Sequence, residues 1–512
     1  MTYGLPRLEP LAATATVQGS ETEDVLEREP RKRTMLRLPS LSPVAWLTVD
    51  RVTQQGLWLI LFAILAPILG PRPYGLFAIV MVFVGFCEFI LLEGAVEALV
   101  TLHKLDHLHT TAANLANAVV AIVFGVAMSV AAPALGSAFH DQELAHVIWA
   151  LAAMPLLSSL SAVPIAVLRR DLQYKQLAVR SILGLVIGGV LGIVLAFTGA
   201  GVWALVAQVL GQRVAELVIA WIAVPVRLGW TWSAPHFHEL RPVAVNVFMA
   251  RMMSLVSGQL PRIVLGYAQG ATEVGLFALA NRFVDMIIFT TVVPRTAVGR
   301  IELRGAKIGS EEFVQDFARM VQNVSVLSFP FFLGVAALVP ELFRLWLDHR
   351  WQAGIVPTQL IVLSGLPLVL FYGIDAALLA ANQSNVFRRM ANLQGVSVAV
   401  TVLCAAPFGL NITCLALAVR PWVLLPVMLM MFGRACQVPA YKVMLPPMRS
   451  LIGSVLMGVL VGLPFLRPAW MNGAVDFVLL GLVGAIFYAG YLYVFARGDL
   501  RALLADVFSL KI

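Results

Sequence analysis

Long apolar stretches recur along almost the whole of this 512-residue chain. Each holds roughly 18 to 25 residues, enough for a helix rising 1.5 Å per residue to cross about 30 Å of hydrocarbon. Strand-like alternation of apolar and polar residues is absent, so helices must satisfy the backbone hydrogen bonds. The sequence predicts an all-α integral membrane protein with about fourteen transmembrane helices, at residues 52–70, 76–100, 112–135, 145–168, 180–199, 201–223, 243–267, 273–294, 320–340, 357–381, 390–408, 411–433, 450–466 and 474–496.

The distribution of charge predicts the orientation of these helices. Only 12% of the residues are charged and 60% are hydrophobic, whereas about a quarter of a soluble domain is charged. Most Lys and Arg residues fall in connections on the side of the N-terminus, and the opposite side holds only Arg72, Arg344, Arg350 and Arg467. This bias places both termini in the cytoplasm. It accounts for the net charge of +8 without a nucleic-acid partner, and adds some attraction to anionic membrane lipid.

A faint internal repeat at an offset of 200 residues relates two parts of the chain. The matching positions share one register without gaps, and they lie where one predicted helix passes through a short loop into the next. A repeat of this length is typical of a transporter whose two related halves enclose a central substrate path. The pairs are Gly70/Gly270, Gly75/Gly275, Leu76/Leu276, Phe77/Phe277, Ala78/Ala278, Phe83/Phe283 and Val84/Val284, extended by Leu65/Leu265 and Arg51/Arg251.

The two ends of the chain differ from the rest. Residues 1–50 are acidic around Glu21 and Asp24, then basic, with little apolar periodicity. They predict a disordered cytoplasmic tail, and no short apolar core with a small-residue cleavage site follows them to indicate a removable signal peptide. Residues 497–512 predict a second cytoplasmic tail.

The connections argue against an enzyme. Those on the outer side are too short to hold the external catalytic loop expected of a membrane glycosyltransferase or polymerase, and no Gly-Lys-Ser/Thr loop indicates an ATP motor. Neither a Ser/His/Asp set nor a zinc-ligand pattern is legible, so no cofactor or metal is expected. His103, His107 and His109 cluster at a cytoplasmic connection, where we interpret them as part of a solvated, interfacial turn.

Ionisable residues within the predicted helices are the candidate machinery, because each costs at least ~2.5 kcal/mol to insert unless it meets water or a partner. Arg251 has no acidic residue three or four positions away, which favours an anionic ligand or a partner on a distant helix. Arg282 can pair with Asp285, and Arg213 with Glu216, so internal neutralisation competes with a functional role. Arg262 and Arg420 could instead reach the membrane surface. The candidates are Arg251, Arg282, Arg262 and Arg420 for substrate, and Asp285, Asp375 and Glu88 for a coupling ion.

Several segments resemble the polysaccharide-transporter branch of the multidrug/oligosaccharidyl-lipid/polysaccharide flippase superfamily, of the colanic-acid and succinoglycan exporter type. An aromatic-basic loop leads into a Gly-rich helix at 172–207, and the junctions at 68–80 and 264–283 resemble the family's Leu/Ile-Gly…Gly-Leu-Phe/Tyr-x-x-Ala pattern. Residues 91–100 resemble the end of its second helix. The similarity extends from about Pro43 to Met430. Members often carry Asp-Arg where this chain has Pro261-Arg262, which leaves Asp285 or Asp375 as the proton site.

The resemblance implies two six-helix bundles, at 51–224 and 240–433, with helices 13 and 14 appended at 450–496. It also implies a flippase that carries an undecaprenyl-diphosphate-linked oligosaccharide from the cytoplasmic to the periplasmic leaflet of a bacterial inner membrane. A polymerase and a chain-length regulator would act in the same pathway. The cavity arginines could match the diphosphate bidentately, and no bond is made or broken.

Three other functions stay open on the sequence alone. A drug or cation antiporter of the same superfamily should favour an acidic, aromatic-lined cavity, whereas this chain offers several arginines. A membrane glycosyltransferase or polymerase would need an external catalytic loop. A non-transporting scaffold would have no reason to keep Arg251 at mid-depth.

Overall fold

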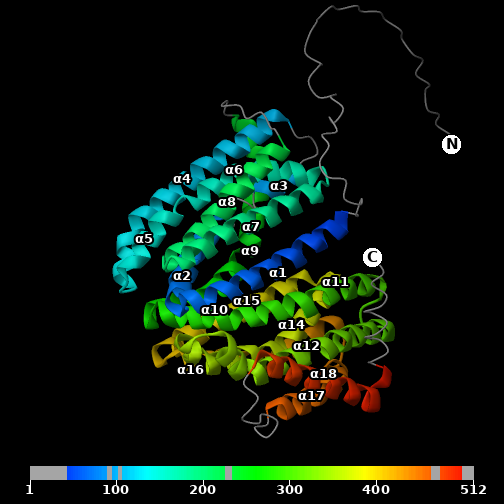
Figure 1. The fold of residues 1–512 in the computed structure, drawn as a ribbon. Helices are drawn as coiled ribbons and strands as arrows, with labels where there is room; N and C mark the ends of the chain where they lie inside the picture. Colours follow the sequence, from blue (N-terminus) through cyan, green and yellow to red (C-terminus); the bar gives the residue numbers. More distant parts are fainter. Residues whose placement is uncertain (1–42, 89–94, 102–105, 225–232, 463–472, 499–512) are drawn as a thin grey trace, which may run out of the picture. The chain divides into compact units, whose positions relative to one another are not determined.

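The computed structural model describes residues 43–88, 95–101, 106–224, 233–462 and 473–498, and these contain helices and no strand (Figure 1). Residues 43–512 form one unit by their internal contacts. The helices of the first part of the chain are α1 (Pro43–Leu69), α2 (Pro71–Glu88), α3 (Ala95–Thr101), α4 (His107–Ala138), α5 (Gln142–Leu151), α6 (Met154–Arg170), α7 (Tyr174–Phe197) and α8 (Val202–Ala223). We call this part the N-terminal half.

The C-terminal half follows, and two further helices end the described chain. The half comprises α9 (Ala234–Gln269), α10 (Ala271–Ile287), the π turn η2 (Ile288–Val292), α11 (Val293–Glu302), η3 (Leu303–Gly305), α12 (Glu311–Trp346), η4 (His349–Gly354), α13 (Ile355–Leu363), α14 (Gly365–Ala380), α15 (Ser384–Ala405), η5 (Ala406–Phe408) and α16 (Leu410–Cys436). The last two helices are α17 (Ala440–Gly462) and α18 (Ala474–Phe495), which pack together against α12 (Figure 1).

The expected membrane-spanning helices are present. Thirteen described helical segments are long and apolar enough to cross a membrane. The fourteenth predicted span, 243–267, coincides with α9, whose 36 residues exceed the length that a bilayer requires. The all-α membrane fold with about fourteen helices is therefore confirmed.

Helix boundaries differ from the prediction where polar residues or prolines occur. Helix α1 begins at Pro43 and takes in residues 43–50, which the sequence assigned to the tail, because proline is favoured in a first helical turn. The span predicted at 145–168 is divided into α5 and α6 just before Pro155. The span predicted at 273–294 continues to Gly305 through the π turn η2, which precedes Pro294. Proline removes an intrahelical hydrogen bond, so these interruptions follow from its chemistry.

The repeat corresponds to a reciprocal contact between α2 and α10. Gly70 and Gly270 both have positive φ, at 78° and 93°, and each ends the preceding helix. A Cβ added at Gly75 would lie 1.6 Å from the carbonyl oxygen of Ala271, and one added at Gly275 would lie 1.9 Å from that of Pro71. Each half thus packs its glycine on the equivalent turn of the other half. Only glycine permits this approach, which explains why the repeat is conspicuous in these turns.

A second contact between the halves surrounds the last turn of α1. The indole N–H groups of Trp346 and Trp351 donate to the carbonyls of Ala63 and Ala66 at 2.8 and 3.0 Å. The Arg350 guanidinium, which Asp348 also binds, donates to three further carbonyls of α1: Pro67 and Ile68 at 3.2 Å and Leu69 at 3.4 Å. Pro67, Ile68 and Leu69 form the end of α1, where backbone carbonyls lack a partner within the helix, so the C-terminal half caps α1. We call Trp346, Arg350 and Trp351 the α1 cap.

Candidate functional site

Two of the predicted arginines lie near one carboxylate in the C-terminal half, close to α1 of the N-terminal half. Arg282 on α10 places its guanidinium 5.8 Å from the centre of the Trp58 ring on α1. Asp285, one turn further along α10, interacts electrostatically with both Arg282 and Arg262. We call Arg262, Arg282 and Asp285 the arginine site. It carries two cations for one anion and is bordered by both halves of the molecule.

The arginine site is not closed by internal ion pairs. The sequence allowed Arg282 and Asp285 to pair, but among the described residues no ion pair within 4.0 Å joins them. Arg262 instead donates to the Oε1 of Gln259 at 2.7 Å, from Nη1. Arg282 interacts with the face of Trp58, which is a weak substitute for a carboxylate. Charge that is not internally paired favours binding of an anion at this place.

Asp375, the second predicted ion-coupling residue, is related to this region by the electrostatic range of Tyr372. Both residues lie on α14, and Tyr372 interacts electrostatically with Asp285 as well as with Asp375. Asp375 in turn interacts with Arg300 on α11. Both predicted coupling carboxylates therefore lie within electrostatic range of the same tyrosine.

Two other predicted substrate residues behave differently. Arg420 on α16 donates to the Ser397 hydroxyl at 2.9 Å and to the Gln394 carbonyl at 3.3 Å, both on α15, so it is bound to the neighbouring helix. Neither partner is another predicted site residue. Arg251 belongs to α9, but its side chain lies outside the described residues. Its role stays a prediction from the sequence.

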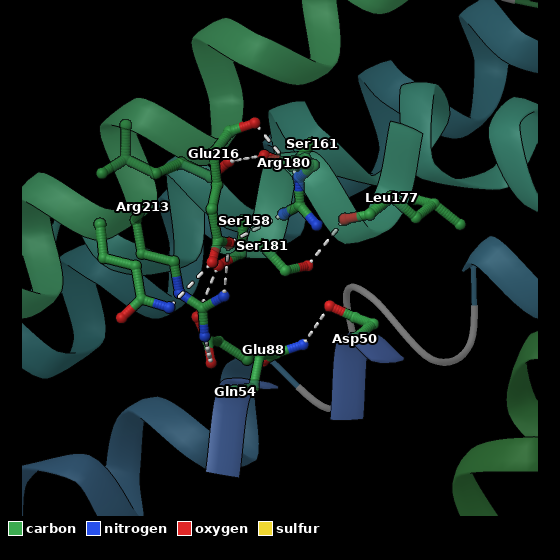
Figure 2. Close-up of polar contacts among 12 residues, drawn as sticks. Asp50, Gln54, Glu88, Ser158, Ser161, Leu177, Arg180, Ser181, Arg213 and Glu216 are labelled. Carbon is green, nitrogen blue, oxygen red and sulfur yellow. Dashed lines mark hydrogen bonds and ion pairs between the residues drawn. The ribbon is translucent and has the colours of Figure 1, made fainter. Parts of the chain in front are cut away.

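The N-terminal half contains a buried network of charges (Figure 2). The predicted pair is present, with Arg213 Nη1 3.1 Å from a carboxylate oxygen of Glu216. Arg180 on α7 approaches the same oxygen at 2.9 Å, and Arg213 also binds Glu88 on α2 at 3.0 Å. The Ser158 hydroxyl donates to the second oxygen of Glu88 at 2.6 Å. We call Glu88, Arg180, Arg213 and Glu216 the charge network.

The charge network is neutral, because two guanidinium groups face two carboxylates. Gln212 donates to the remaining oxygen of Glu216 at 2.8 Å. Asp50 on α1 lies close enough to interact electrostatically with Arg180 and Glu216, and is itself bound by Gln54 at 2.8 Å (Figure 2). Glu88, predicted as an ion-coupling residue, is thus fully engaged within the N-terminal half. This arrangement favours a role in joining α2, α7 and α8.

Sequence reasoning missed Arg180, which stands at the cytoplasmic edge of the span predicted at 180–199 and was counted with the basic residues of that side. Helix α7 begins at Tyr174, six residues before the predicted start, and Arg180 is only 9% exposed. A signal was available in the glycines of α7, spaced four residues apart on one face, which allow close helix packing. A Cβ at Gly184 would lie 2.4 Å from the Glu216 side chain, and one at Gly188 would lie 2.3 Å from the Gln208 carbonyl oxygen on α8. This close approach brings Arg180 and Glu216 together.

Comparisons with known proteins agree with this architecture. A family profile described as "Polysaccharide biosynthesis protein" matches residues 64–356, which is more than half of the chain. The succinoglycan biosynthesis transport protein ExoT of Rhizobium meliloti (strain 1021) is 23% identical over 310 residues. That alignment takes in 60% of this chain and 62% of the relative, so the chain spans about three fifths of its length.

Two solved structures share the fold. The lipid II flippase MurJ, in an inward closed conformation, matches 89% of this chain and 99% of its own, with a TM-score of 0.72 and 13% identity. A multidrug resistance MATE family transporter of the MOP superfamily, in an inward-facing conformation, matches 77% of this chain and 98% of its own, with a TM-score of 0.57 and 15% identity. At these identities the likeness shows the fold alone.

Proposed function

We propose, because the chain belongs to the polysaccharide biosynthesis protein family, that it is a flippase for lipid-linked oligosaccharide repeat units. The chain is a membrane transporter with the fold of the MOP superfamily. Its proposed substrate is an undecaprenyl-diphosphate-linked oligosaccharide used in exopolysaccharide or lipopolysaccharide synthesis. The proposed location is the bacterial inner membrane, with both termini in the cytoplasm, and a polymerase and a chain-length regulator are the proposed pathway partners.

The arginine site is the observation that carries this proposal. A diphosphate is dianionic or nearly so, and it cannot enter hydrocarbon without cationic partners. Arg262 and Arg282 together exceed the charge of Asp285 and border both halves. Guanidinium groups bind phosphate oxygens bidentately, so the two could exchange their present neighbours for a diphosphate. The protein would then carry the diphosphate head group across the hydrocarbon core of the membrane, without making or breaking a covalent bond.

Asp285, Asp375 and Glu88 are the proposed coupling residues, in that order. Asp285 lies near the two arginines. A proton or cation bound to it would compete with the substrate for this site, or would bind after the substrate has left. Asp375 shares Tyr372 with it. Glu88 ranks last because Arg213 and Ser158 already bind its two oxygens. A drug or cation antiporter remains the second candidate function, supported by the MATE-like fold and by two aromatic residues at this place, Trp58 beside Arg282 and Tyr372 within electrostatic range of Asp285.

Replacement of Arg282 tests the proposal. In a strain that lacks the gene, Arg282→Ala should abolish polysaccharide export and leave lipid-linked repeat units in the cytoplasmic leaflet, whereas Arg282→Lys should keep partial export because it retains charge without the planar fork. Export is measured per folded molecule. The control is Arg388→Ala, on a surface arginine that binds Asn385 of its own helix. Normal export by Arg282→Ala would remove the arginine site from the substrate path.

Arg251 is tested in the same assay, on the sequence argument alone. Arg251→Ala should abolish export, and Arg251→Lys should retain part of it. If Arg251→Ala exports normally per folded molecule, its role is structural. Export of a cationic dye in place of polysaccharide by the wild-type protein would favour the antiporter.

A further inference from the structure

Two histidines and an aspartate meet where α4 and α9 begin. Asp106 precedes α4, His109 lies in its first turn, and His236 lies in the first turn of α9. Their potential ligand atoms all lie within 4.8 Å of one another. The two imidazole rings make an edge-to-face contact with centres 4.4 Å apart. The sequence led us to expect His109 in a solvated turn. In the structure, however, His109 is only 5% exposed and is therefore buried. His103, of the same sequence cluster, lies outside the described residues.

The local structure of both helix ends holds these side chains in place. The backbone N–H of Asp106 donates to His109 Nδ1 at 3.3 Å, and the Ser233 hydroxyl lies 2.5 Å from His236 Nδ1. Leu240, one turn beyond His236, is buried among residues of α3, α4 and α6, including Leu99. The beginning of α9 is thus packed against the N-terminal half, and His236 reaches His109 from a helix rather than from a loop.

We propose that Asp106, His109 and His236 form a binding site for a divalent transition metal such as Zn²⁺, Co²⁺ or Ni²⁺. Imidazole nitrogen with one carboxylate suits these ions, whereas Mg²⁺ and Ca²⁺ prefer oxygen ligands alone. The carboxylate supplies negative charge beside two helix N-termini that carry partial positive charge. Three protein ligands leave the remaining position for water.

The present geometry is close to what such an ion requires. With each ligand about 2.0 to 2.2 Å from the ion, tetrahedral ligand atoms lie about 3.3 to 3.6 Å apart. The cluster, whose atoms lie within 4.8 Å, has to tighten by no more than about 1.5 Å. Side-chain rotation supplies this, and at His109 it replaces the hydrogen bond that Nδ1 accepts from the Asp106 N–H, because a metal-bound imidazole has no lone pair left to accept one. The Ser233 hydroxyl can accept as readily as donate, so it can orient the His236 ring in the metal-bound tautomer.

A metal at this place would join the two halves of the transporter. Asp106 and His109 belong to the N-terminal half, and His236 belongs to the first helix of the C-terminal half. The alternative is that both histidines only cap their helices, in which case no metal binds tightly.

The test uses the full-length protein in detergent, with its purification tag removed and its metal stripped by a chelator. Co²⁺ is the probe, because tetrahedral Co²⁺ absorbs in the visible range, and Zn²⁺ is titrated by calorimetry. We expect one ion per chain. His236→Ala and His109→Ala should weaken binding by at least about tenfold, since even second-shell changes cost that much. His238→Ala is the matched control, because His238 is exposed on the same helix.

A second measurement guards against misfolded alanine variants. Asp106→Asn keeps a side chain able to cap α4 but removes the charge. Excess Zn²⁺ should raise the thermal unfolding temperature of the wild type and of His238→Ala, because it binds only the folded state, and should raise that of Asp106→Asn much less. The proposal is overturned if the wild type binds no Co²⁺, or if His236→Ala, His109→Ala and Asp106→Asn all respond to metal as His238→Ala does.

Discussion

At the scale of single residues, Glu216 is the centre of the charge network. Its carboxylate binds Arg180, Arg213 and Gln212, and its own side chain is only 5% exposed. Glu216→Gln keeps the shape but leaves two buried guanidinium groups with insufficient negative charge. Removing one partner of a buried ion pair costs about 3 to 5 kcal/mol. We expect a clearly lower thermal unfolding temperature and less folded protein in the membrane, measured by thermal denaturation in detergent.

The matched control for Glu216 is Asp316, which binds Arg319 at 3.1 Å where the arginine side chain is 67% exposed. Asp316→Asn should change the free energy of unfolding by less than about 1 kcal/mol, because solvent screens exposed pairs. Equal effects of the two substitutions would show that the charge network does not stabilise the fold. Arg213→Ala should act mainly through Glu88, since Glu216 would keep Arg180.

At the scale of helices, the crossing of α2 and α10 depends on two glycines. Gly75→Ala places a methyl group 1.6 Å from a backbone carbonyl oxygen, which cannot move aside as a flexible side chain could. Overpacking costs about 1 to 3 kcal/mol or more, and this contact is at the severe end. We expect Gly75→Ala to remove most folded protein from the membrane, measured as detergent-extractable monodisperse protein.

Gly85 on the same helix provides the comparison, since a Cβ there has no atom within 4 Å. Gly85→Ala should be neutral or stabilise the helix by up to about 1 kcal/mol. If Gly75→Ala accumulates as well as Gly85→Ala, the backbones of α2 and α10 do not cross this closely in the folded protein.

Hydropathy was sufficient to predict these helices but not which of their side chains meet. A window that averages apolar content puts Arg180 at the very start of a predicted span, although α7 begins six residues earlier, because the first turns of that helix are polar. His236 was missed for the same reason, since α9 extends from Ala234 while only its later turns are apolar. The repeat was more informative, because the backbone contact at Gly75 and Gly275 requires glycine at both positions, and this requirement is visible in the sequence. An ion pair between distant helices, such as Glu88 with Arg213, produces no pattern in the sequence from which the pair could be predicted.

At the scale of the whole molecule, the testable property is topology. Reporter fusions at Arg304 and Arg388 should report cytoplasm, and fusions at Ala138 and Leu347 should report periplasm. The physical reason is the excess of Lys and Arg on one side of the membrane. Ala138 ends α4 and Leu347 follows α12, so both lie at helix ends where a fusion leaves the preceding spans intact. A reporter on the wrong side at any of the four positions would contradict the count of fourteen.

The reciprocal packing of Gly75 and Gly275 also bears on ancestry. A contact in which position 75 meets residue 271 while position 275 meets residue 71 is the pattern of an isologous two-fold interface. If a shorter ancestral chain had only one copy of this junction, two identical molecules could have made the same contact with each other. Fusion of two such genes would then have converted a homodimer into a single chain, and freed each half to acquire its own charges: the charge network in the first, the arginine site in the second.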